Sequence, residues 1–422
     1  APDATSSSES TAQGDGSSPP ASADISSAEA STSPSADERV HSAGDVEGER
    51  RGESASPAAT DSAVSAEHQP FDSAAPTGSP LARAVQPQRV PEGADVSHPS
   101  LFFNRELSWL DFNWRVLQMA RDRRTPLLER LRFLSITAQN LDGFIRKRIG
   151  GLKRQAAAGV TSLSPDGRTP EEQLAHIVRA VRPMYSALGH TWKQLEPELE
   201  KEIGLRVQDY ADLEASQKEK LAAYFRKNIF PILTPLAVDP GRPFPFISNM
   251  SLSLAVLLRH PDRGTQHFAR VKVPTSRARW LSLDEPLHFV PIEQVIAHHV
   301  DELFQGMQVE GVYAFRVTRN ADVRRDEEEA DDLIEMISER LRERRFAPVV
   351  RLEVDHDMPE SVRSFLMEKL SIGPEDVYVA DGIIDFTDVR VLADLHVPDD
   401  RYHKALRFSK WTPLTPPRLR RG

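Results

Sequence analysis

The sequence has 422 residues, enough for two or three domains, and 53 Lys and Arg against 63 Asp and Glu give it a net charge of −10 at pH 7. It contains no cysteine, which excludes disulfides, zinc–thiolate sites and cysteine nucleophiles. No apolar run reaches the roughly 18 residues that a membrane span needs, so we expect a cytoplasmic protein and leave peripheral membrane association open.

Residues 1–97 form a tail rich in Ser, Ala, Pro, Gly and acidic residues, with Phe71 as its one aromatic residue. The tail carries the negative charge of the chain, because its acidic residues outnumber its arginines and it has no lysine. Such a composition buries too little apolar surface to offset the entropy lost on ordering, so we predict disorder. A regulatory or phosphorylated tail is the alternative to a passive solvated extension.

Residues 98–203 predict a helical domain. Ser108 and Asp111 resemble a capping box, and apolar residues follow them at helical spacing. Thr125 followed by Pro126 predicts a second helix with a capping threonine and proline at its first position.

The same device recurs at Thr169, Pro170 and Glu172, where it predicts the start of a long helix. Pro183 falls inside that helix and should bend or interrupt it. Short links between these helices favour a bundle.

Residues 204–398 predict an α/β head domain, because apolar residues begin to alternate with polar or small ones, as half-buried strands require. Several adjacent strands lack a crossover helix between them, so we expect a mixed sheet. The predicted strands are 252–258, 268–273, 313–317 and 350–354, and the predicted helices are 216–228, 331–345 and 360–370.

Residues 399–422 are polar and rich in proline, and we interpret them as a linker toward a further domain that this chain does not contain. No phosphate-binding loop, dinucleotide-binding glycine motif or His-x-Lys segment is present. The adjacent pair His298 and His299 is better explained by a solvated helix surface than by a metal site. The residues by themselves provide no complete catalytic constellation.

The main positive feature is a basic run between Arg115 and Arg154, where only Asp122, Glu129 and Asp142 are acidic. Clustered guanidinium groups on a rigid element suit phosphate oxygens. A solvated basic face explains the run equally well, and nucleic acid is the weakest alternative because no aromatic platform accompanies the charge. The basic residues are Arg115, Arg121, Arg123, Arg124, Arg130, Arg132, Arg146, Lys147, Arg148, Lys153 and Arg154.

Within this run, Asn140, Phe144 and Arg148 lie at i, i+4 and i+8 and are predicted to share a helix face. A carboxamide beside an aromatic ring and a cation has the groups to recognise a purine edge and hold its phosphates. An asparagine inside a helix also often bonds a neighbouring helix, and the spacing alone favours that structural role.

Several stretches in sequence order resemble the first polyphosphate kinase family, the long bacterial enzymes that extend polyphosphate from ATP. Their residue patterns are most similar to those of actinobacterial members. They cover about residues 100–395. They are FNRELSWLDFN at 103–113, RLRFL at 130–134, NLDGF at 140–144 with Arg148, FPILTPLAVDP at 230–240, PFPFIS at 243–248, GTQHFARVKVP at 264–274 and RVTRNAD at 316–322.

The resemblance implies a helical N-terminal domain and a head domain that supports a homo-oligomer, either a dimer or a tetramer, followed by two phospholipase-D-like domains that carry the phosphorylated histidine. It implies ATP and polyphosphate as partners and magnesium as a cofactor, with the magnesium ligands in those C-terminal domains. Asn140 matches the asparagine that contacts ATP in the family. No catalytic residue and no metal ligand can be carried over to this chain.

Two residues depart from the family pattern, because Gly143 replaces a glutamate and Lys147 an apolar residue. Gly143 costs about 1 kcal/mol of helix stability relative to alanine, so the helix that carries Asn140 is expected to be weaker. We expect this chain by itself to bind ATP weakly. We expect an ATP-dependent polyphosphate kinase, represented here by its N-terminal part and inactive alone. The alternative is a non-catalytic module that oligomerises and binds ATP or polyphosphate.

Overall fold

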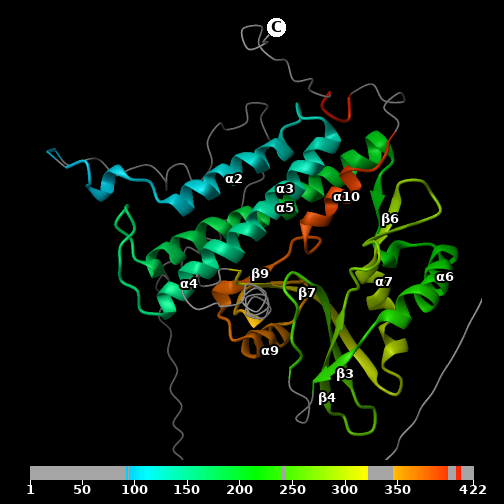
Figure 1. Ribbon diagram of the computed structural model, residues 1–422. Coiled ribbons are helices and arrows are strands. Elements are labelled where there is room, and N and C mark those ends of the chain that lie inside the picture. The colour runs from blue at the N-terminus through cyan, green and yellow to red at the C-terminus, as the bar shows by residue number, and fades with distance from the viewer. Residues whose placement is uncertain (1–91, 94, 239–243, 322–345, 398–404, 410–422) are drawn as a thin grey trace, which may run out of the picture. The chain divides into compact units, whose positions relative to one another are not determined.

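The computed structural model of the chain describes residues 92–93, 95–238, 244–321, 346–397 and 405–409. These residues belong to one compact unit, residues 70–422, and are coloured in Figure 1. The predictions for the tail up to residue 91, for a helix at 331–345 and for most of the linker lie outside the described residues. Within them, a helical N-terminal region precedes an α/β part with a mixed sheet, as predicted.

Helix α2 spans Arg105–Arg121 and begins one turn earlier than the sequence predicted. Asn104 caps it, because its side-chain oxygen accepts hydrogen bonds from the backbone N–H groups of Glu106 and Leu107, each at 3.1 Å. Ser108 therefore lies inside the helix, at an exposed position, and the predicted capping box was wrong. Asparagine is as good an N-cap as serine, so the capping signal lay four residues upstream.

The second helical stretch consists of three segments that follow one another directly: α3 at Leu127–Phe144, a π-helical turn η2 at Ile145–Ile149 and α4 at Gly150–Ala157. Pro126 occupies the cap position itself and makes no side-chain cap bond. Thr125 is one residue too early to cap the helix, so this prediction was also wrong.

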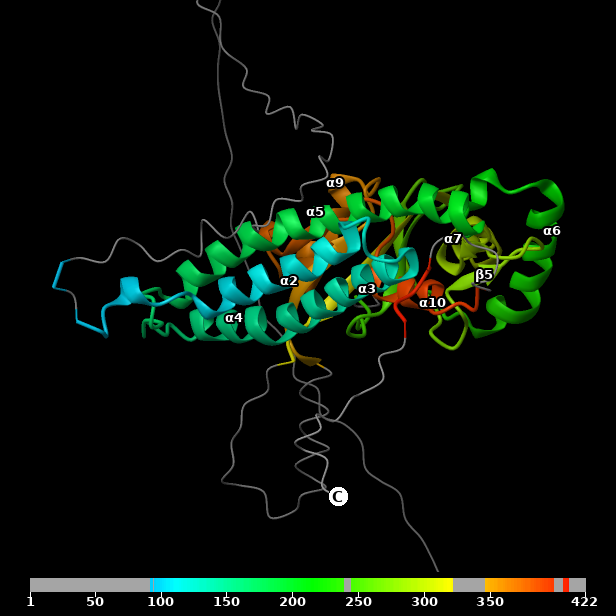
Figure 2. The same ribbon diagram turned by 90° about the horizontal axis from the view of Figure 1, so that it is seen from above.

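Helix α5 spans Pro170–Ile203, and its predicted capping box is confirmed. The backbone N–H of Glu172 donates to the Thr169 hydroxyl at 3.2 Å, and the Thr169 N–H donates to the Glu172 carboxylate at 2.9 Å. Pro183 does not interrupt the helix, because a continuous buried stripe from Ile177 onward packs into the bundle and maintains the helix around the proline. Figure 2 shows α2 and α5 running alongside the continuous line of α3, η2 and α4, and together they form a bundle.

The main sheet has six strands in the order β2-β4-β3-β7-β8-β9, and its neighbours are antiparallel except for the parallel pair β8 and β9. All four predicted strands occur in it. A smaller sheet has the order β1-β6-β5, with β1 and β6 parallel. The strands are β1 Arg206–Val207, β2 Leu236–Val238, β3 Leu252–Arg259, β4 Gln266–Lys272, β5 Trp280–Ser282, β6 His288–Pro291, β7 Gln308–Arg319, β8 Val349–Val354 and β9 Val377–Val379.

Shorter helices cover and connect these sheets. The predicted helix at 360–370 is confirmed as α9, and the one at 216–228 as α6 followed by a second π-helical turn, η4. The α-helical segments are α6 Ala215–Tyr224, α7 Ile292–His298, α9 Glu360–Leu370 and α10 Val389–Ala393, with η4 at Phe225–Ile229. The 3₁₀ turns are η1 Pro99–Leu101, η3 Tyr210–Asp212, η5 Phe230–Ile232, η6 Val300–Leu303, η7 Pro374–Asp376 and η8 Phe386–Asp388.

Both faces of β8 and of the second half of β7 are covered. Helix α9 packs against one face, where Leu366 contacts the cluster that contains Phe315 and Val317. The opposite face carries charged side chains, yet Arg316 and Arg351 there are each only 1% exposed because α3 and α5 lie over them. The prediction of a half-buried strand was therefore wrong for β8. Alternating polar residues in a sequence do not show whether the polar side chains face water or another part of the protein.

Helix α10 returns to the helical bundle, beside α3 in Figure 1. Its buried residues Val389 and Leu392 belong to the same apolar core as the bundle. Just before it, the carbonyl of Thr387 accepts a hydrogen bond from the Ser135 hydroxyl of α3 at 2.7 Å. The bundle core therefore includes residues from the far end of the chain.

Candidate functional site

Asn140 lies half-buried on α3 and bonds α2. Its Nδ2 donates to Oδ1 of Asn113 at 3.0 Å. Asn113 is fully buried, and its own Nδ2 donates to the backbone carbonyl of Thr137 at 3.2 Å and to the sulfur of Met184 at 3.4 Å. Helices α2, α3 and α5 meet at Asn113. Asn140 thus makes the bond to a neighbouring helix expected of a structural asparagine, and its contact with a nucleotide stays a prediction.

The other two residues of the predicted face also contact α2. The ring of Phe144 stacks on Trp109, with centroids 4.7 Å apart. Nε of Arg148 lies 3.7 Å from the carboxylate of Glu106. The π-helical turn η2 begins right after Phe144, so the α-helical spacing used in the prediction does not extend to Arg148. Its contact with α2 nevertheless places it on the same side of the helix.

The basic run is largely paired within the molecule. Arg130 is buried and donates to the carbonyl of Ala120 at 3.0 Å and to Glu198 at 2.6 Å. Arg132 pairs with Asp394 of the segment after α10 at 2.6 Å. Further pairs are Arg115 with Asp111, Arg124 with Asp122, Arg123 with Glu198 and Lys153 with Asp376. Arg130, Arg132 and Lys153 thus hold elements together, which neither the phosphate-binding nor the solvated-face interpretation anticipated. Arg115, Arg123 and Arg124 are exposed, as a solvated face requires.

Asp142, in the same motif as Asn140, anchors the bundle to the sheet. Its carboxylate accepts hydrogen bonds from Arg316 at 2.6 Å and from Arg351. Glu353 pairs with Arg316 at 2.7 Å and accepts from the Tyr185 hydroxyl at 3.2 Å. Burial disfavours the charged carboxylate, but Arg351 and Arg316 outweigh it and lower the pKa of Asp142 to about 2. Sequence reasoning missed this role because the arginine partners lie 174 and 209 residues away.

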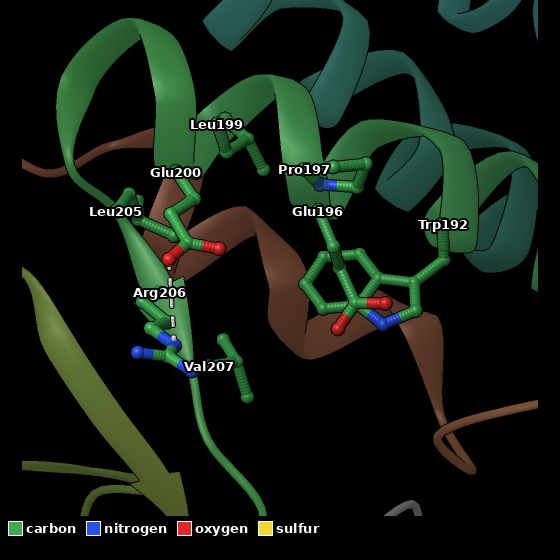
Figure 3. A pocket seen from close by; sticks show the side chains of 8 residues that line it. All are labelled: Trp192, Glu196, Pro197, Leu199, Glu200, Leu205, Arg206 and Val207. Carbon is green, nitrogen blue, oxygen red and sulfur yellow. Dashed lines mark ion pairs between the residues drawn. The ribbon is translucent and has the colours of Figure 1, made fainter.

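A pocket of about 200 Å³ lies at the junction of α5 and β1 (Figure 3). Burial, followed by the charge of Asp209, raises the pKa of Glu196 there to about 7. Glu200 pairs across the pocket with Arg206 at 3.6 Å. No sequence pattern marked Glu196, since its environment forms only when β1 packs beside the helix. The lining residues are Trp192, Glu196, Pro197, Leu199, Glu200, Leu205, Arg206 and Val207.

The histidine pair differs from the prediction of a solvated surface. His298 is exposed, but His299 is buried, stacks on Phe225 with centroids 4.9 Å apart, and has its Nε2 3.2 Å from the Tyr210 hydroxyl. Burial is the main cause that lowers the pKa of His299. Within the described parts of the chain, no three His, Asp or Glu side chains gather as they would around a metal ion. Across those same parts, each helix is too short or too polar to cross a membrane.

Two family models match the chain. The model of the polyphosphate kinase N-terminal domain matches residues 102–206, and that of the polyphosphate kinase middle domain matches residues 216–392. The first covers the bundle that carries Asn140, and the second covers both sheets apart from β1. The two matches follow one another along the chain.

Individual relatives agree. A polyphosphate kinase of Synechocystis sp. is 43% identical over 338 residues, which are 77% of this chain and 46% of that protein. A polyphosphate kinase of Mycobacterium tuberculosis is 42% identical over 324 residues, which are 73% of this chain and 44% of that protein. It is an actinobacterial relative, as the motifs suggested. The crystal structure of polyphosphate kinase from Porphyromonas gingivalis has a TM-score of 0.58 at 26% identity and covers 74% of this chain and 43% of that one.

The chain thus spans somewhat less than half the length of the relatives that it matches. Both matched regions and the fold point to the same group of proteins. The chain belongs to the polyphosphate kinase family.

Proposed function

We propose that this chain provides the ATP-contacting part of an enzyme that reversibly transfers the γ-phosphate of ATP to polyphosphate, with Asn140 as the ATP contact. The supporting observation is the edge where α2 meets α3, at which Asn140, Phe144 and Arg148 each contact α2. The family relatives extend well beyond the matched region, so activity, substrates and partners are part of the proposal.

The three side chains have complementary chemistry for a nucleotide. The carboxamide of Asn140 presents a hydrogen-bonding group to a purine edge. The partly exposed ring of Trp109 adds an apolar surface on α2, held rigid by stacking on the buried ring of Phe144. Arg148, about half exposed, offers a guanidinium to phosphate oxygens, and its long contact with Glu106 leaves most of its donors available.

We assign the phosphoryl-transfer step to no residue of this chain, because the sequence contains no His-x-Lys segment. The described residues also do not fit a magnesium site, since they gather no group of three acidic or histidine side chains. We therefore derive no step through a metal. We further propose 98–203 and 204–398 as the two domains of the described part, 1–97 and 399–422 as its flanking tail and linker, and a homo-oligomer as the assembly, in line with the family resemblance.

Isothermal titration of ATP into the purified chain tests the proposal. Asn140→Ala should weaken binding about tenfold, which corresponds to the loss of one well-placed hydrogen bond and its desolvated partner. Gln139→Ala, which truncates the adjacent exposed amide of α3, is the matched control and should leave the affinity unchanged. Equal affinities of the wild type and Asn140→Ala would contradict the ATP contact.

Incubation of the purified chain with ATP and magnesium addresses the catalytic part. We expect no polyphosphate and no phosphohistidine. Polymer synthesis by this chain alone would contradict the assignment of phosphoryl transfer to residues outside it.

A further inference from the structure

The orientation of the Asn140 carboxamide is fixed by a chain of hydrogen bonds that starts at a backbone carbonyl. A carbonyl oxygen only accepts, so the atom of Asn113 that faces Thr137 at 3.2 Å has to be Nδ2. The Oδ1 atom of Asn113 then faces Asn140, and the atom of Asn140 that donates to it at 3.0 Å has to be Nδ2. Each link leaves the next amide a single orientation.

The opposite orientation is strongly disfavoured. Turning Asn113 over would place its Oδ1 against the carbonyl oxygen of Thr137, so that two acceptors meet. It would also place Nδ2 of Asn113 against Nδ2 of Asn140, so that two donors meet. Asn113 is 0% exposed, so water cannot compensate for either mismatch. The contact with the sulfur of Met184 uses the same Nδ2 and supports the same orientation.

Asn140 therefore presents its oxygen to a ligand. Its Nδ2 is engaged by Asn113, and within the described part of the chain no donor reaches its Oδ1. The side chain is half-buried at the surface of the bundle, so this oxygen is accessible from outside. The site thus offers a hydrogen-bond acceptor, Oδ1, at a fixed position, and the second N–H of Nδ2 lies beside it in an equally fixed orientation.

We infer that Asn113 is a positioning residue that makes the site selective for purine nucleotides with an amino group at position 6, against those with an oxo group there. This inference rests on the proposed contact of Asn140 with ATP. The 6-amino group of adenine donates to Oδ1 of Asn140. The 6-oxo group of hypoxanthine or guanine is itself an acceptor, so it cannot donate to Oδ1 of Asn140. The hydrogen bond is then lost, and the two oxygen atoms repel each other.

The test compares ATP with inosine triphosphate, which differ at position 6 and in the protonation of N1. Calorimetric titration of the full chain should give the wild type at least about tenfold tighter binding of ATP, the loss expected for one hydrogen bond and an unpaired acceptor. Asn113→Leu removes the acceptor for Nδ2 of Asn140 and frees its carboxamide to turn over. The variant should bind ATP more weakly and inosine triphosphate more tightly, so the ratio of the two affinities should fall toward one.

This ratio separates positioning from a structural role. A loosened bundle would weaken both nucleotides by the same factor and leave the ratio as it is. Thr137→Val is the matched control, because it removes a buried hydroxyl on the same turn of α3 that bonds only the carbonyl of Phe133. It should keep the wild-type ratio. Thermal unfolding of each variant checks that the fold is retained, and Asn113→Ala replaces Asn113→Leu if the larger side chain disturbs packing.

The outcomes also distinguish this inference from the proposed function. If ATP binding does not depend on Asn140, the proposed function fails. If ATP binds through Asn140 but the wild type does not discriminate against inosine triphosphate, or a folded Asn113 variant keeps the wild-type ratio, the proposed function stands and the role of Asn113 is overturned.

Discussion

At the scale of single residues, Glu196 is a carboxyl group whose ionisation opposes folding. Its pKa rises from 4.5 to about 7, because burial and Asp209 disfavour the charged form. The folded state therefore holds this proton more tightly than the unfolded state. The free energy of unfolding falls as pH rises from about 4.5 to 7 and stays lowered above that. Glu196→Gln should raise stability at pH 8 by roughly 1–3 kcal/mol, with little gain at pH 4, in urea unfolding at both pH values.

Glu200 provides the matched control, since it lines the same pocket four residues later and is about half exposed beside Arg206. Glu200→Gln breaks an exposed ion pair and should change stability by less than about 1 kcal/mol at pH 8. If both variants gave the same gain at pH 8, the effect would reflect net charge rather than the burial of Glu196.

At the scale of elements, the start of α5 depends on its capping box. Thr169→Ala removes the acceptor for the N–H of Glu172 and should destabilise the protein by about 1 kcal/mol in thermal or urea unfolding. Ser108→Ala is the control, because Ser108 is exposed inside α2 and alanine has the higher helix propensity. It should leave stability unchanged or slightly raised. A loss at Ser108 as large as that at Thr169 would contradict the observed start of α2.

The π-helical turn η2 is an element that the head region holds in place. The backbone N–H of Ala321 donates to the carbonyl of Arg146 at 2.9 Å, and Nδ2 of Asn320 donates to that of Gly150 at 3.1 Å. A Cβ atom on Gly150 would lie 2.2 Å from the Asn320 side chain, so only glycine allows this approach. The carbonyls of Arg146 in η2 and of Gly150 at the start of α4 thus both accept from the two residues that follow β7.

At the scale of the whole molecule, Asp142 and its two arginines join the helical bundle to the six-stranded sheet. Asp142→Asn leaves Arg316 and Arg351 buried with one carboxylate fewer and should cost about 3–5 kcal/mol of stability at pH 7. The native pKa of about 2 lies below the unfolded value of 3.8, so this stabilisation is present above about pH 4 and is lost as pH falls toward 2. Urea unfolding between pH 2 and 7 should show that slope in the wild type and a shallower one in the variant.

Asp394→Asn is the control for this prediction, because it neutralises a carboxylate that also pairs with an arginine of α3 but is 43% exposed. Its cost should stay below about 1 kcal/mol, since an exposed pair is screened by water. Equal costs for the two variants would mean that burial of the Asp142 network contributes nothing extra.

Much of the fold followed from local patterns. The capping box at Thr169, the alternation in β3, β4, β7 and β8, and the periodicity of α9 each depend on neighbours within a few residues. The predictions at Ser108 and Thr125 failed by a few residues, because several good capping residues stand close together and only the packed helix selects one.

The sequence by itself determined the helical and α/β organisation, and its motifs singled out Asn140, Phe144 and Arg148. Only the tertiary structure decided what those residues contact, because their partners on α2 lie 27 or more residues away. It also showed that most of the basic run is paired and that the polar face of β7 and β8 is a buried ionic network. The physical reason is that burial and ion pairing belong to groups from distant segments, which a local pattern does not bring together.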